Sequence, residues 1–124
     1  MKKRLLFLLV LVLPATSWAQ EVPKDKWLEV MTVTIPTYFC QAGQYFRECF
    51  DVTAEQCEQV AQSAARNCIS KMEQQIPEKL RHPADSRMWG TKLGNCAGIA
   101  YEGTLAGKHK SDPTCQDARN WQGG

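Results

Sequence analysis

The chain has 124 residues, with 15 Lys and Arg, 13 Asp and Glu, and a formal net charge of +2. Three of the 15 basic residues are Lys2, Lys3 and Arg4, so the rest of the chain carries 12 basic against 13 acidic residues. A near-neutral domain gives no indication of a nucleic-acid partner or an anionic membrane surface as a partner.

A secretory signal is predicted over residues 1–19. Its basic start is followed by nine apolar residues (Leu5–Leu13) and by small residues at the two positions that a signal peptidase reads, Ser17 and Ala19. The apolar run is less than half of the roughly 20 residues that a transmembrane helix needs. We expect cleavage after Ala19, a single domain over residues 20–124 without a membrane span, and a periplasmic or secreted location.

Two short helices are predicted between Trp27 and Phe50, after a loose polar segment at residues 20–26. The segment Val30–Ile35 is rich in β-branched residues, and Pro36 cannot continue a helical hydrogen-bond ladder. We therefore expect a break there, with Pro36 opening the second helix. The apolar residues that recur every three or four positions are Trp27, Met31, Ile35, Phe39, Ala42, Phe46 and Phe50.

The next helix carries the clearest signal. Thr53 and Gln56 form a capping box, and Pro77 is expected to end the helix before a connecting loop at residues 77–84. The opposite face is polar, as in an amphipathic helix that packs on a core. The apolar stripe consists of Cys57, Val60, Ala61, Ala64, Ala65, Cys68, Ile69, Met72 and Ile76.

A last helix is predicted from Asp85, as its N-cap, to Gly107, followed by a polar tail at residues 108–124. Its packing face is Trp89, Leu93, Cys96, Ala97 and Ala100. The glycines Gly90, Gly94 and Gly98 form a stripe that lets another helix approach closely, within this chain or in a homodimer. The predicted fold is all-α: a disulfide-stapled antiparallel helical hairpin, a third packed helix and a tethered C-terminal tail.

The six cysteines predict three disulfides, because an even number in a short exported chain is typical of a disulfide framework. Cys57 and Cys68 share a helix face about 16 Å apart, too far to bond to each other. The predicted bridges are Cys49–Cys57, Cys40–Cys68 and Cys96–Cys115. Exchanges with Cys96 are the main alternative, since the sequence does not determine connectivity. We predict no metal and no cofactor, because closely spaced ligand pairs are missing from the sequence.

Catalytic patterns are weak. A triad of Ser86, His82 and Asp85 is conceivable, but Asp85 is better explained as a helix cap. Glu102 could act as a general acid, although a solvated helix face explains it more simply. We predict a non-catalytic binding protein. The alternatives are a small secreted hydrolase or lipid-binding protein with a cleft near Glu102, and a structural accessory of an envelope machine.

In its signal, its 105-residue mature length, its bridged helical pattern and the segment Gly94–Gly98, the chain resembles small periplasmic immunity proteins against cell-wall-degrading toxins. The resemblance implies a stoichiometric inhibitor that occludes the cleft of a toxin enzyme. Muramidase clefts work with carboxylates, so the inhibitor would present basic or aromatic groups. The predicted partner-binding residues are Lys79, Arg81, His82, Arg87 and Trp89.

Overall fold

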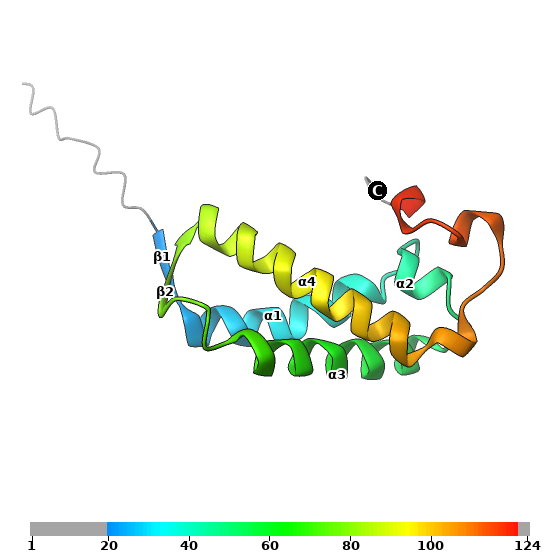
Figure 1. Ribbon diagram of the computed structural model, residues 1–124, viewed down its shortest axis with the longest axis horizontal. Helices are drawn as coiled ribbons and strands as arrows, with labels where there is room; N and C mark the ends of the chain where they lie inside the picture. Colours follow the sequence, from blue (N-terminus) through cyan, green and yellow to red (C-terminus); the bar gives the residue numbers. More distant parts are fainter. Residues whose placement is uncertain (1–19, 122–124) are drawn as a thin grey trace, which may run out of the picture.

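Three long helices form the body of the protein in the computed structural model, which describes residues 20–121. They are α1 (Lys24–Phe39), α3 (Ala54–Met72) and α4 (Ala84–Thr104), and they confirm the predicted helical fold class (Figure 1). The predicted signal at residues 1–19 lies outside the described residues. No helix within residues 20–121 is long and apolar enough to cross a membrane.

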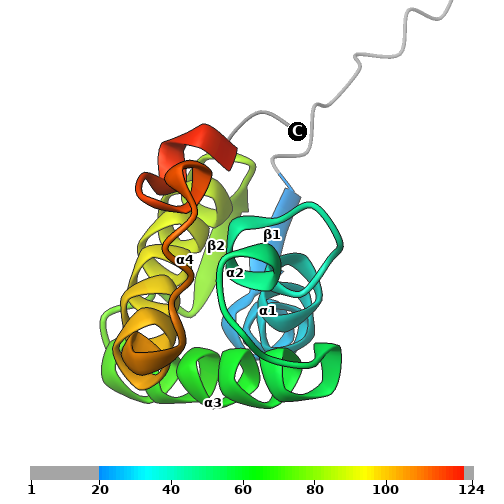
Figure 2. The same cartoon turned by 90° about the vertical axis from the view of Figure 1, so that its right-hand side faces the viewer.

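Helix α3 is the base of the fold. It packs extensively against both α1 and α4, whereas α1 and α4 touch each other little. In the end view, α1 and α4 lie above α3 on its two sides (Figure 2). The chain turns back between α1 and α3, which form the antiparallel hairpin, and α4 is the third packed helix.

Helix α1 runs through Pro36, so the predicted break is wrong. Pro36 lies in the last turn of α1 and accepts a hydrogen bond from the Cys40 main-chain N–H at 3.1 Å. The missing proline N–H removes only one bond of the ladder. Ile35 just before the proline and Phe39 three residues after it are both buried, so tertiary packing maintains the helix.

The N-terminal segment and the predicted loop at residues 77–84 are also ordered differently from the prediction. Strand β1 (Gln20–Pro23) pairs antiparallel with β2 (Lys79–His82), placing Val22 opposite the fully buried Leu80. Lys24 strengthens this junction: its main-chain N–H donates to Glu78 O and its ammonium to Glu73 O, both at 2.9 Å. Pairing between segments 60 residues apart has no local sequence signal.

Helix α3 begins as predicted. Gln56 N–H donates to Thr53 Oγ1, and Thr53 N–H donates to Gln56 Oε1, which is the reciprocal capping box. The helix ends at Met72, earlier than the predicted stop at Pro77. Helix α4 differs at its start, where Pro83 is the N-cap residue and Asp85 instead accepts a hydrogen bond from Arg81 N–H at 2.8 Å.

All six cysteines are bonded, which confirms three disulfides, but each predicted pairing is wrong. The bridges are Cys40–Cys57, Cys49–Cys115 and Cys68–Cys96. The prediction assumed a second helix through residue 50. Instead, the connection turns at Gly43 (φ +84°) and contains only the four-residue α2 (Tyr45–Glu48). Cys40 is therefore at the hairpin tip opposite Cys57.

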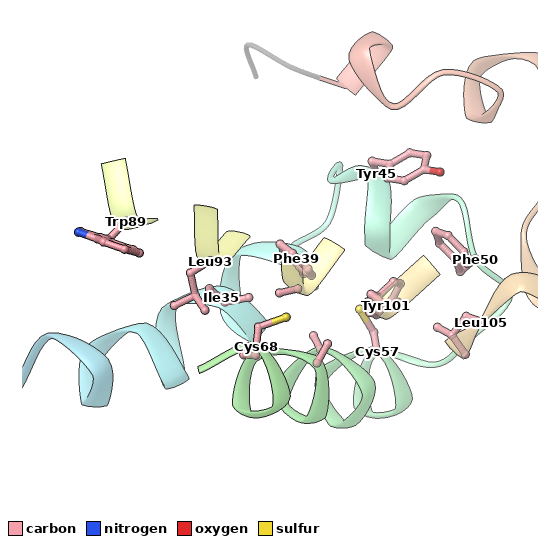
Figure 3. Close-up of a cluster of buried hydrophobic side chains, with 14 of the residues drawn as sticks. Ile35, Phe39, Tyr45, Phe50, Cys57, Cys68, Trp89, Leu93, Tyr101 and Leu105 are labelled. Carbon is pink, nitrogen blue, oxygen red and sulfur yellow. Dashed lines mark hydrogen bonds between the residues drawn. The ribbon is translucent and has the colours of Figure 1, made fainter. Parts of the chain in front are cut away.

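The core is densest where α2, α3 and α4 meet. Tyr101 of α4 is fully buried, and its ring meets those of Phe46 and Phe50 edge-on. Figure 3 shows Tyr101 beside Cys57, on the inner side of α3. These contacts fix α2 relative to the long helices, and thereby position the residues of the site described next.

Candidate functional site: the groove between α1 and α4

A groove of about 650 Å³ opens where α1 and α4 diverge. This volume is within the usual range for small-molecule sites, about 300–1,000 Å³. Its lining comes from four segments: α1, the α2 region, α4 and the C-terminal 3₁₀ turn η3 (Ala118–Trp121). The lining residues are Met31, Thr34, Ile35, Tyr38, Phe39, Gln44, Tyr45, Phe46, Gly90, Thr91, Gly94, Asn95, Gly98, Ile99, Glu102, Ala118 and Trp121.

The predicted glycine stripe of α4 lies in this groove. A Cβ on Gly90 would lie 3.9 Å from the Trp27 ring, and one on Gly98 would lie 3.0 Å from Phe46 Cζ. A Cβ on Gly94 would meet nothing within 4 Å. Aromatic side chains therefore pack against both ends of the stripe. Its middle, at Gly94, faces open space.

The groove has an apolar, partly aromatic lining with one charged side chain, Glu102. Glu102 is half-buried on α4, one turn beyond Gly98. The neighbouring Tyr45 is buried, which raises its phenol pKa to about 12, and the Glu102 carboxylate adds to the rise. The hydrogen bond of the Tyr45 hydroxyl is to His109 Nε2, at 3.2 Å.

Two apolar side chains on the rim of the groove are exposed. Tyr38 of α1 is 55% exposed and Ile99 of α4 is 74% exposed. Both also line the groove, so apolar surface continues from its interior to its rim. An apolar rim around a concave site is typical of surfaces that bind a ligand or partner.

The C-terminal tail supplies one wall of the groove. Trp121 lines it and is anchored by a hydrogen bond from its indole N–H to Thr114 O, at 2.9 Å. The tail itself is attached through Cys115 to Cys49. The sequence prediction of a tethered tail is therefore confirmed, but its anchor is the α2 region instead of Cys96.

The predicted partner-binding residues do not line the groove; they lie on β2 and in the first turns of α4, before Gly90. Lys79, Arg81, His82 and Arg87 are exposed. Arg81 is engaged by Asp85, with Nε 3.1 Å from Oδ2, which holds the pKa of the Asp85 carboxyl below its usual range. Trp89 is only 9% exposed and belongs to the core, so it does not join the exposed basic residues on the surface.

The conceivable triad is not assembled. His82 Nδ1 lies 2.8 Å from Ser86 Oγ, but the Asp85 carboxylate receives its hydrogen bonds from Arg81. A triad needs the carboxylate on the second histidine nitrogen. Within residues 20–121, no cluster of three His, Cys, Asp or Glu side chains could hold a metal ion.

Of the sequence candidates, Glu102 is the one that the structure places in the groove. The sequence signal for Glu102 is a lone carboxylate next to small residues. From the sequence, this combination was explained as a solvated helix face. The aromatic lining was missed because Phe39 and Phe46 were considered only as members of a helical packing face, and Tyr38 and Tyr45 lie outside that pattern.

Fold and site together define a small disulfide-bonded helical domain of the extracytoplasmic kind, with an open groove between two of its helices. The family model described as T2SS substrate NttA matches residues 21–109, so the chain belongs to this family of type II secretion substrates. The match includes the three long helices and five of the six cysteines. Neither a curated protein nor a solved structure matches the chain.

A type II secretion substrate is exported by way of the periplasm, which confirms the predicted location. Three disulfides agree with passage through an oxidising compartment.

Proposed function

We propose that this secreted protein is a non-catalytic binding protein whose binding site is the groove between α1 and α4. One observation carries the proposal: the groove is concave and apolar, while its rim exposes Tyr38 and Ile99. When a ligand covers exposed apolar side chains at a concave site, the removal of this surface from water stabilises the complex.

Binding is favoured over catalysis because the lining offers few groups that could act as a general acid or base. Glycoside hydrolysis uses two carboxyl groups, and the lining contains only Glu102. The Tyr45 phenol, which also lines the groove, has its pKa raised to about 12 and stays protonated at neutral pH. A protonated phenol is a poor general base. This supports the lipid-binding form of the Glu102 hypothesis more than its hydrolase form.

The proposal is tested with Nile red, a neutral fluorescent apolar probe. We expect saturable binding to the purified mature protein, and loss of binding in Gly94→Leu, whose side chain would enter the open centre of the groove. Gly103→Leu is the matched control, because Gly103 is on the same helix, has open space at its Cβ and does not line the groove. Equal binding by both variants would place the probe elsewhere and overturn the proposal.

The narrower hypothesis of an inhibitor of a cell-wall-degrading enzyme rests on the basic cluster around Arg81 and Arg87, which do not line the groove. Charge reversal of both residues is expected to weaken inhibition of a muramidase. Unchanged affinity in a calorimetric titration would count against this form of the proposal.

A further inference from the structure

We infer that the groove takes an organic ammonium ligand: an apolar chain or ring system that ends in a positively charged nitrogen. This inference rests on the proposed function and specifies the chemistry of its ligand. It follows from the charge, the ring content and the shape of the groove.

Charge is the first argument. Glu102 is the only charged side chain that lines the groove, and none of the lining residues is a lysine, arginine or histidine. Two arginines of the tail and of the α2 region do not line the groove: Arg119 is paired with Asp117, and Arg47 donates to Val52 O at 3.1 Å. The groove therefore favours a cationic over an anionic head group.

Ring content is the second argument. Five aromatic residues line the groove, and Tyr38 among them is 55% exposed. The faces of Trp, Tyr and Phe rings attract cations, and aromatic surroundings are the usual means of binding ammonium groups. The carboxylate and the rings lie at the same end, since Glu102 follows Gly98 by one helical turn and Gly98 faces the Phe46 ring. The lining aromatic residues are Tyr38, Phe39, Tyr45, Phe46 and Trp121.

The shape of the groove indicates where the apolar part of the ligand lies. From Gly90 to Glu102 the groove follows α4 over twelve residues, which is about 18 Å of helix. Gly94 leaves the middle of this length open, and Ile35 of α1 supplies an apolar wall. The α2 region and the tail also line the groove, and both lie toward the C-terminal end of α4 (Figure 1). A ligand with its nitrogen at Glu102 would thus extend its apolar part toward Gly90.

Three ten-carbon probes separate the charge requirement from apolar binding. They are cationic decylammonium, anionic decanoate and neutral decyl maltoside, each used below its critical micelle concentration. We expect decylammonium to bind the mature protein with an affinity about tenfold above that of decanoate, from attraction in one case and repulsion in the other. In ¹⁵N-labelled protein, the shifted resonances should include Gly94, Ile99, Glu102 and the Trp121 indole.

Two substitutions of Glu102 test the role of its charge. Glu102→Gln should weaken decylammonium binding about fivefold and leave decyl maltoside unchanged. Glu102→Lys should reverse the order, so that decanoate binds more tightly than decylammonium. Gly94→Leu should abolish binding of all three, with Gly103→Leu as the control. The thermal midpoint of each variant shows whether it has kept its fold.

The outcomes separate this inference from the proposed function. If decanoate or decyl maltoside binds in the groove as tightly as decylammonium, the ammonium inference is overturned while the groove remains the binding site. If none of the probes shifts the groove resonances, both are overturned. Binding that survives Gly94→Leu also contradicts both.

Discussion

The Tyr101 hydroxyl donates a hydrogen bond to the main-chain carbonyl of Phe46 at 2.8 Å and lies 3.2 Å from Cys57 Sγ. One phenol thus connects α4 with α2 and with the Cys40–Cys57 bridge. The contact joins residues 55 positions apart in the sequence, at the end of the groove where the aromatic rings gather.

Tyr101→Phe should lower the free energy of unfolding by about 1 kcal/mol, because it removes the donor and leaves the Phe46 carbonyl without its partner. Urea denaturation followed by circular dichroism measures the change. Tyr38→Phe is the matched control: this side chain is 55% exposed, and its loss of a hydroxyl should change stability by less than about 0.5 kcal/mol. An equal loss in both variants would contradict the assigned role of Tyr101.

Stability should fall at high pH because two buried phenols resist ionisation. Burial raises the pKa of both Tyr101 and Tyr45 to about 12, from an ordinary value of 10.0. Below pH 10 both states keep these protons, and their contribution is complete. Between pH 10 and 12 the unfolded chain loses protons that the folded protein retains, so stability declines as the pH rises. Urea midpoints measured across this range should fall less steeply in Tyr101→Phe.

Two glycines of α4 should respond to alanine in opposite directions. Gly94→Ala adds a methyl group in open space and should raise stability by up to about 1 kcal/mol through helix propensity. Gly98→Ala places a Cβ 3.0 Å from the Phe46 ring, which is held between Phe39 and Tyr101 and cannot retreat. We expect a net loss of about 1 kcal/mol or more from overpacking. Thermal midpoints of the two variants compare them directly.

Peptide mapping without reduction should recover the pairs Cys40–Cys57, Cys49–Cys115 and Cys68–Cys96. Any peptide linking Cys49 to Cys57 would contradict the structure.

Removal of the tail bridge should act locally. Cys49→Ala with Cys115→Ala releases residues 111–121, so trypsin should cut rapidly after Lys110 and Arg119 while the three helices remain protected. Cys68→Ala with Cys96→Ala is the comparison, because that bridge joins α3 to α4 and its loss should cost about 2–5 kcal/mol of global stability. Rapid tail cleavage in the second variant alone would reverse the assignment.

Local patterns predicted much of the helical framework. The capping box at Thr53 and the buried stripe of α3 depend on residues within one helix, and both are present as expected. The argument that Cys57 and Cys68 must bond to different segments also held, since it required only the geometry of one helix.

Relationships between distant segments could not be predicted in this way. Six cysteines allow fifteen pairings, and the short α2 changed which ones were within reach. The pairing of β1 with β2 and the survival of α1 through Pro36 both depend on tertiary packing. The groove exists because α1 and α4 diverge over α3, an angle that neither helix encodes alone.

Since Trp121 is positioned by a tail whose anchor is the Cys49–Cys115 bond, one wall of the groove is a product of oxidation. In a reducing cytoplasm this bond does not form, so the wall is not fixed in place even if the helices have folded. The proposed binding site is therefore complete only after export to an oxidising compartment. The proposed site would lose the same wall again wherever the Cys49–Cys115 bond is reduced.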